Sequence, residues 1–322
     1  MGMGVLSYLE AARLALAEEM RRDPLVWAVG EDLGRGGVFG QYRGLVEEFG
    51  AERISDAPIS EAAILGASVG AAMMGTRPVV EMRFSDFALC AVDELVNQAA
   101  KARFMFGGQT RVPMVVREPI GMWRSSAAQH SQSLEAWYAH IPGLVVACPA
   151  TPADNKGLLK TAIRCDDPVV YMEHKNLWPL EGEVPDGEHL VPFGVARIAR
   201  PGRDLTLVSW SAQVHVSTAA ADALAEHGIE VEVIDLRTLW PWDRASVLAS
   251  AARTGRLLIA HEAVQVGGFG AEIAAVVAET LHIPVRRLGA PRAPIGYAPP
   301  VENAVRVTEA MTVAAIRAML GR

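Results

Sequence analysis

The sequence has few cysteines, and none of them pair at a metal-binding spacing. Cys90, Cys148 and Cys165 are the only cysteines, and they lie far apart in 322 residues. An odd number of widely spaced cysteines excludes a disulfide framework and a C-x-x-C zinc site. We expect all three to be reduced core residues of a cytoplasmic protein.

Long apolar runs, a basic leader and an excess of positive charge are also missing. The longest apolar stretch, Ala62 to Gly75, is shorter than the ~20 residues of a membrane-spanning helix. The N-terminus lacks the basic and then apolar order of a signal peptide. Lys and Arg number 30 against 37 Asp and Glu, a formal net charge of −7. We therefore expect a cytoplasmic protein that binds neither nucleic acid nor a membrane.

Phosphate-binding glycine motifs are absent as well. The segment from Gly30 to Gly44 is dense in glycine, but its spacing matches neither G-x-G-x-x-G nor the Walker pattern. The missing dinucleotide fingerprint disfavours a nucleotide-binding oxidoreductase.

Short apolar segments alternate with helical segments along the whole chain. A capping box at Ser7 and Glu10 predicts a helix from about Tyr8 to Arg22, and an apolar strand follows at Val26–Gly30. This alternation predicts an α/β protein with mostly parallel, doubly wound sheets.

Proline and glycine become frequent after about residue 174, which marks a change of domain. We expect a first α/β domain over residues 1–180, a linker over 181–203 and a second α/β domain over 204–322. The second domain shows no grouping of acid, base and nucleophile, so we assign it to assembly.

Glu61 is the only charged side chain between Pro58 and Gly75. In one interpretation Glu61 is simply an acid in the first turn of a helix capped by Ser60, where the helix dipole favours a negative charge, and it has no further function. The helix that follows is apolar on every side, however, and is expected to be buried. A carboxyl group in such a place has to be paired or protonated, which is typical of active sites. The residues alone leave both interpretations open.

A long irregular segment over residues 118–143 carries His130. Loops longer than ~12 to 15 residues in compact domains are usually functional, although a single histidine is more often structural. Phe84 and Phe87 lie at a strand-to-helix junction, where they can stack on a flat ring or simply fill the core.

Several segments together resemble one family. They include VGEDLGRGGVF, DAPISEAAILGASVGAA, GTRPVVEMRFSDF, AAQHSQSLEAW, VEVIDLRTLWPWD and GGFGAEIAA. The sequence resembles the beta subunit of the thiamine-diphosphate-dependent component of 2-oxo acid dehydrogenase complexes, as in pyruvate, branched-chain and acetoin dehydrogenases. The likeness covers nearly the whole chain in collinear order. It implies a transketolase-like pyrimidine-binding domain followed by a transketolase C-terminal-type domain.

The resemblance also implies partners. Beta subunits of this family form heterotetramers of two alpha and two beta chains and deliver acyl groups to a lipoyl-bearing acyltransferase core. Thiamine diphosphate lies at the interface, with its diphosphate and magnesium held by a Gly-Asp-Gly motif of the alpha subunit. No Gly-Asp-Gly occurs here, in agreement with half an active site.

Matched positions carry the implied roles. Glu61 matches the acid that bonds to the N1′ atom of the aminopyrimidine ring, favours its imino tautomer and so promotes removal of the thiazolium C2 proton. Phe87 matches the aromatic residue that packs on that ring, and Ile59 matches a residue whose backbone contacts the ring. His130 matches an active-site histidine that handles protons. The backbone carbonyls of a family potassium site fall on Met114, Ala162, Ile163, Cys165 and Asp167.

Departures from the family leave the substrate open. Arg83 lies beside the implied pyrimidine pocket, where an uncharged residue is usual, and residues 122–124 include the bulky Trp123 in place of small residues. We expect oxidative decarboxylation of pyruvate or a related 2-oxo acid. Cleavage of acetoin by the same Glu61 chemistry is the alternative, and a non-catalytic assembly subunit of the same fold is a third.

Overall fold

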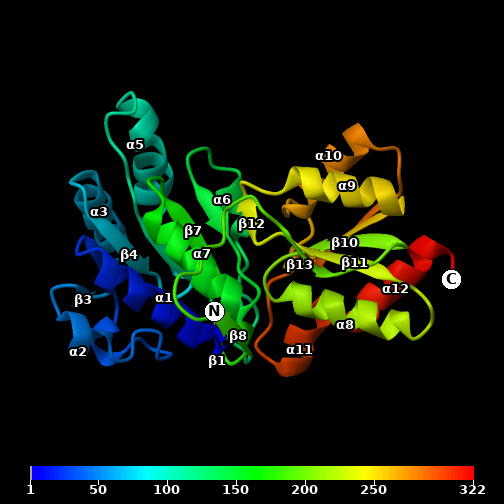
Figure 1. Cartoon of the computed structure of the whole chain (residues 1–322), viewed down its shortest axis with the longest axis horizontal. Coiled ribbons are helices and arrows are strands. Elements are labelled where there is room, and N and C mark those ends of the chain that lie inside the picture. Colours follow the sequence, from blue (N-terminus) through cyan, green and yellow to red (C-terminus); the bar gives the residue numbers. More distant parts are fainter. Residues whose placement is uncertain (1) are drawn as a thin grey trace.

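A computed structural model describes residues 2–322 as two α/β domains side by side (Figure 1). The strands of the first domain are β1 (Met3–Ser7), β2 (Val26–Gly30), β3 (Ile54–Asp56), β4 (Arg77–Glu81), β5 (Val115–Ile120), β6 (Val145–Ala147), β7 (Val169–His174) and β8 (Glu181–Pro185). Its helices are α1 (Tyr8–Arg22), α2 (Leu45–Phe49), α3 (Glu61–Met73), α4 (Ser85–Ala88), α5 (Ala100–Met105), α6 (Glu135–Ala139) and α7 (Pro152–Arg164), with a π-helix over Glu94–Ala99 leading into α5.

The second domain has its own sheet. The strands of this sheet are β9 (Arg197–Arg200), β10 (Leu205–Ser209), β11 (Val231–Asp235), β13 (Leu257–Val264) and β14 (Val285–Ala290), whereas β12 (Thr238–Trp240) belongs to the sheet of the first domain. The helices of the second domain are α8 (Gln213–Ala225), α9 (Arg244–Thr254), α10 (Gly270–Thr280), α11 (Pro299–Ala304) and α12 (Glu309–Leu320). Helices α9 and α10 cover one face of this sheet, and α8 and α12 the other (Figure 1).

The two large sheets are mostly parallel, as predicted, and β1 and β8 form a separate antiparallel pair. The larger one has the strand order β12-β6-β7-β5-β4-β2-β3, in which only β12 runs antiparallel to its neighbour. The smaller one has the order β14-β13-β10-β11-β9, with β9 antiparallel at the edge. Helices on both faces make each sheet doubly wound.

The segment expected to be a linker, residues 181–203, is not a free connection. Its first part forms β8, which pairs with β1, and its later part forms β9 in the second sheet. Strand β12 comes from beyond the expected boundary and yet adds to the edge of the first sheet. One apolar core cluster extends from Leu65 of α3 to Ile273 of α10, so the two domains share a core.

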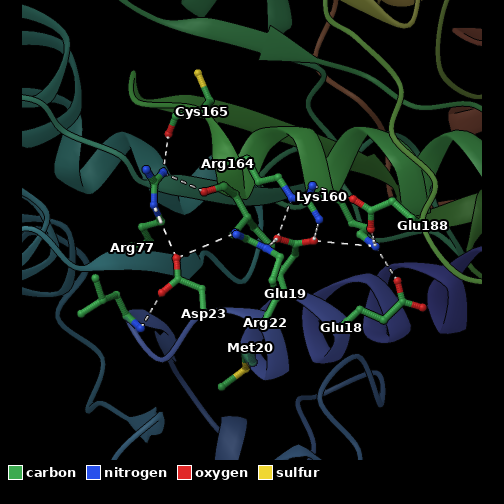
Figure 2. A network of polar contacts seen from close by, with 12 residues as sticks. Glu18, Glu19, Met20, Arg22, Asp23, Arg77, Lys160, Arg164, Cys165 and Glu188 are labelled. Atoms are coloured by element: carbon green, nitrogen blue, oxygen red, sulfur yellow. Dashed lines mark hydrogen bonds and ion pairs between the residues drawn. The ribbon is translucent and has the colours of Figure 1, made fainter.

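The predicted start of α1 at its capping box is confirmed, whereas Ser60 makes no side-chain cap on α3. The Ser7 hydroxyl accepts from the Glu10 amide and starts α1, and Thr151 caps α7 in the same way. Figure 2 shows how charged side chains join these two helices: Arg164 binds Glu19 at 2.6 Å, and Lys160 binds Glu18 at 2.7 Å. Glu19 is fully buried, and its pairs with Arg164 and Arg22 compensate its charge.

The cysteines are free, as expected, but they are not all core residues. Cys148 is buried, Cys165 is partly buried and Cys90 is exposed. Cys90 sits in a short 3-10 turn where one side of the chain faces outward. Among residues 2–322, no helix has both the length and the apolar character needed to cross a bilayer.

Candidate functional site

Five neighbouring parallel strands, β7, β5, β4, β2 and β3, direct their carboxyl ends to one edge of the large sheet. The chain segments that leave this edge carry Lys175 after β7, His130 after β5, Phe87 after β4, Glu31 after β2 and Glu61 after β3. Open parallel sheets bind their ligands at this edge. The topology therefore collects residues that are more than 100 positions apart in sequence at one place.

Three aromatic rings meet at the centre of this edge. The imidazole of His130 lies 4.9 Å from the ring of Phe84 and 5.0 Å from that of Phe87, and the two phenyl rings are 5.6 Å apart. All three pairs are edge-to-face, the arrangement that aromatic quadrupoles favour. The structure thus brings together Phe87 and His130, which the sequence assigned to the same site.

The aromatic cluster continues toward Trp123. Phe39 lies 6.2 Å from Phe84, 5.5 Å from Trp123 and 4.4 Å from Trp178. Trp123 and Trp178 are themselves 5.6 Å apart. Trp123, the bulky residue that departs from the family pattern, is therefore part of a continuous aromatic surface beside His130.

Glu61 is the first residue of α3, as predicted, but the helix is not buried on all sides. Ser60 stands at the N-cap position, although its hydroxyl donates to the Pro58 carbonyl and not to the helix. Ile64 and Leu65 face the core, whereas the opposite face is exposed and consists of small residues. The chain by itself buries only half of this apolar helix, and Glu61 is partly buried at the border between the two faces.

The predicted pyrimidine contacts on either side of Glu61 differ in exposure. Ile59 is 80% exposed, so its backbone is accessible at the surface next to α3. Phe87 is partly buried in the ring cluster described above. Both residues lie in segments that leave the same sheet edge as Glu61.

Arg83 points to carboxylates that follow β2. Its Nη1 atom donates to Asp32 at 2.6 Å, and its Nε atom is 3.8 Å from Glu31. Burial raises the pKa of Glu31, Arg83 opposes this effect, and the nearby charge of Glu61 adds to it. The Arg83 charge is thus neutralised by an acidic pair next to Glu61, which explains how a cation is accommodated here.

The loop that carries His130 is held by specific hydrogen bonds. The Gln132 carbonyl accepts from the Ser85 hydroxyl at 3.2 Å and from the Gly121 amide at 3.3 Å, and the Gln132 amide group donates to Asp86 at 2.8 Å. The backbone of this loop is strained, because three non-glycine residues have positive φ. They are Arg124 (48°), Ser125 (58°) and Ala127 (63°).

The second domain also holds this loop. The Met122 amide donates to the Glu262 carboxylate at 2.8 Å, and the Ser125 amide donates to Glu302 at 2.9 Å. Glu262 additionally accepts from His174 Nε2 at 3.0 Å. The expectation that the second domain serves assembly alone is therefore too narrow, since its carboxylates position the loop with His130.

A cavity of about 510 Å³ lies behind the same loop, between the two domains. Its walls include Ser131, Trp137, Gly268 and Ile295. Neither Glu61 nor any of the three central rings lines it, so it is separate from the edge where the candidate residues meet.

The carbonyls assigned to potassium lie at the opposite edge of the sheet. The guanidinium of Arg77 donates to the carbonyl of Cys165 at 3.0 Å (Figure 2). It also donates to the carbonyl of Ile163 at 3.1 Å and to Asp166 at 2.7 Å. The carbonyls of Met114 and Ala162 accept backbone amides. With the cation of Arg77 in this place, the set that also includes Asp167 does not fit a potassium ion.

Some site residues were not recognised from the sequence. Glu31 and Lys175 directly follow strands, so the rule that ligands bind at the carboxyl ends of strands would have pointed to them. Phe39, Glu262 and Glu302 reach the site through tertiary packing and left no local signal.

The fold and this site define a class: a two-domain protein of the transketolase type. The transketolase pyrimidine-binding domain family matches residues 5–181, and the transketolase C-terminal domain family matches residues 194–311. A solved split-gene transketolase, an inactive beta4 tetramer, is 23% identical, covers 99% of both chains and superposes with a TM-score of 0.83. That likeness shows the fold.

Curated relatives narrow the class. The 2-oxoisovalerate dehydrogenase subunit beta of Bacillus subtilis is 42% identical and covers 98% of both chains. The acetoin:2,6-dichlorophenolindophenol oxidoreductase subunit beta of Cupriavidus necator is 43% identical over 97% of this chain and 96% of its own. The pyruvate dehydrogenase E1 component subunit beta of Rhizobium meliloti is 42% identical over 98% of this chain and 70% of its own. The chain belongs to this family of dehydrogenase E1 beta subunits.

Proposed function

We propose that the chain is the beta subunit of a thiamine-diphosphate-dependent 2-oxo acid dehydrogenase that passes the acyl group to a lipoyl-bearing acyltransferase. The observation that carries the proposal is the convergence of Glu61, Phe87 and His130 at one sheet edge, beside a helix whose apolar face the chain leaves uncovered. An alpha subunit covers that face and completes the site. The cytoplasmic location stays a prediction.

The residues present fit the aminopyrimidine half of the cofactor. A partly buried phenyl ring at Phe87 offers a face for a flat heterocycle, and the accessible backbone of Ile59 offers polar groups at its rim. The Glu61 carboxylate lies at the end of an apolar helix, where an N–H donor would satisfy it. The chain has no Gly-Asp-Gly motif for the diphosphate, so we assign magnesium and the diphosphate to the alpha subunit.

Each residue then has a defined task. When bound, thiamine diphosphate supplies the nucleophilic carbon that adds to the substrate carbonyl. Glu61 would hold the ring nitrogen of the pyrimidine through a hydrogen bond and would so favour the tautomer that acts as a base. Phe87 and Ile59 fix the ring, and the His130 imidazole gives or takes a proton at the substrate oxygen. The aromatic surface that includes Trp123 excludes water from the reacting atoms.

Acetoin cleavage is the second candidate, supported by the 43% identity to the acetoin-specific relative. It uses the same Glu61 chemistry on a carbon–carbon bond in place of a carboxylate. A non-catalytic assembly subunit is less favoured, because Glu61, Phe87 and His130 are all present.

The proposal is tested by co-expression with the alpha subunit. We expect the chains to co-purify and to reduce an artificial electron acceptor with pyruvate, a branched 2-oxo acid or acetoin. The substrate preference separates the two candidate activities. A complex that turns over none of these substrates, or a chain that never associates with alpha, contradicts the proposal.

Glu61→Gln in the assembled enzyme tests the central residue. We expect C2 proton exchange of the cofactor to fall about 100-fold or more, the usual range for loss of acid–base assistance, while the thermal midpoint stays unchanged. Glu47→Gln is the matched control, because Glu47 is exposed and remote from the edge. Retained exchange in the Glu61 variant refutes the assigned role.

The isolated chain gives an independent test. Because it lacks the diphosphate motif, we expect calorimetry to detect no tight binding of thiamine diphosphate without alpha. Micromolar binding by the chain alone would contradict the shared site.

A further inference from the structure

Lys175 is a fully buried lysine directly after β7, with 0% of its surface exposed. Among residues 2–322 it forms no ion pair within 4.0 Å. Its Nζ atom donates to the backbone carbonyl of His130, and the same atom lies 4.6 Å from the centroid of the Phe84 ring. A buried ammonium without an ion-pair partner is destabilising, so its retention calls for a function.

The surrounding charges support this view. Burial lowers the pKa of Lys175 to about 8, opposed by the carboxylates of Asp86, Glu262 and Glu302. These three carboxylates come from α4, β13 and α11, and each has other partners: Gln132 for Asp86, and the amides of residues 122 and 125 for the two glutamates. They therefore act on Lys175 through space.

Lys175 contacts His130 by two routes. The first is the main-chain carbonyl, which receives a charge-assisted hydrogen bond, the stronger kind. The second is Phe84, whose ring carries the ammonium at 4.6 Å and contacts the imidazole at 4.9 Å. The loop backbone is strained nearby, so a strong tether is needed to keep His130 in one place.

We infer that Lys175 is the positioning residue of His130: its ammonium fixes the His130 backbone and the ring against which the imidazole packs. The inference deepens the proposed function and rests on its assignment of His130. Lys175 is not itself a catalytic residue, because its Nζ atom is inside the protein and bonded to the loop.

A double-mutant cycle in the assembled enzyme tests the inference. Lys175→Met removes the charge and the donor at similar volume, and Lys175→Gln keeps a neutral donor. Since small displacements of a reacting group can cost ~100-fold, we expect Lys175→Met to lower kcat by about 10- to 100-fold and Lys175→Gln by less. In the His130→Ala background, Lys175→Met should cause no further loss. An equal loss in both backgrounds overturns the inference.

Lys101→Met is the matched control, because the partly buried Lys101 also donates to a backbone carbonyl, that of Pro142, away from the site. We expect this variant to keep the kcat of the wild type. If Lys101→Met lowers kcat as much as Lys175→Met does, the loss is common to lysines that bind a backbone carbonyl. A specific role of Lys175 is then refuted.

Hydrogen–deuterium exchange of the full chain gives a readout that needs no activity. We expect Lys175→Met to accelerate exchange in the peptide over residues 121–134 and Lys101→Met to leave it unchanged. Unchanged exchange in the Lys175 variant overturns the inference even if the enzyme is active. If Lys175→Met accelerates exchange but the assembled wild-type complex is inactive on every substrate, the proposed function is refuted. The role of Lys175 in holding the His130 loop then still stands.

Discussion

The Glu262 carboxylate of β13 accepts the Met122 backbone amide at 2.8 Å, across the boundary between the two domains. His174 Nδ1 accepts from the Asn176 amide at 3.1 Å, so it is Nε2 that donates to Glu262, at 3.0 Å. The pKa of Glu262 is lowered, because His174 and the Met122 amide outweigh its burial. One carboxylate thus joins the second domain to the end of β7 and to the segment that follows β5.

Replacing this carboxylate should loosen the loop without unfolding the protein. We expect Glu262→Ala to leave two buried donors unpaired, to lower stability by about 1–3 kcal/mol and to lower kcat by roughly 10-fold. Thermal unfolding and steady-state kinetics measure the two effects. Glu272→Ala, at an exposed position on α10, is the control and should change neither. Wild-type kcat in the Glu262 variant would contradict a positioning role.

Gly121 should tolerate no side chain. A Cβ atom at this position would lie 2.0 Å from His174 Nε2, and the residue has a φ of +91°. We expect Gly121→Ala to displace His174 or the loop and to abolish most activity. Gly228→Ala is the matched control: it has a φ of +71° and no neighbour within 4 Å of the added atom, so it should cost only the backbone strain, ~1–3 kcal/mol. Equal effects of the two variants would show that the contact with His174 is unimportant.

Lys175→Met should be at least as stable as the wild type at neutral pH although it is less active. Burial lowers the pKa of Lys175 from 10.5 to about 8, so between these values the unfolded chain binds more protons and wild-type stability rises with pH. Below pH 8 the folded wild type bears the full cost of the buried ammonium, roughly 3 kcal/mol. Lys175→Met removes this cost but also loses the hydrogen bond from Lys175 to the His130 carbonyl, which reduces its gain in stability. Denaturant unfolding from pH 7 to 10.5 measures the rise, which the variant should lack. A strongly destabilised variant at pH 7 would indicate a structural lysine.

Potassium should not stabilise the wild-type chain more than sodium does, because the Arg77 guanidinium already binds the carbonyls of Ile163 and Cys165. Thermal unfolding in matched potassium and sodium chloride tests this. We expect Arg77→Met to lose stability, since it leaves the carbonyls of Ile163 and Cys165 without their donor and removes one of the two arginines that bind Asp166, the other being Arg111. A potassium-specific rise in the wild-type midpoint would restore the predicted metal site.

Much of the fold was predictable because its signals are local. The cap at Ser7 uses a side chain next to the helix that it begins, and that helix is found over Tyr8–Arg22 as predicted. The apolar strand predicted at Val26–Gly30 is found with the same bounds. The strands β8, β9 and β12 were missed, since they exist only through pairing with distant segments.

The site was predictable in part for the same reason. Phe87 and His130 were placed together by resemblance, and their ring contact of 5.0 Å agrees. The burial of α3 was overestimated, because an apolar composition cannot show whether the covering surface belongs to the same chain. Glu302 contacts a loop 177 positions away, a relationship that no local pattern encodes.

Strand β12 makes the two halves of the molecule inseparable as building blocks. It leaves the second domain only to run antiparallel beside β6, where Thr238 pairs with Ala147. A chimera that joins the first domain of one relative to the second domain of another must therefore preserve the pairing of β12 with β6. Otherwise β6 becomes an unpaired edge strand, which promotes aggregation. Gene shuffling within this lineage is thus expected to exchange whole subunits far more readily than half-subunits.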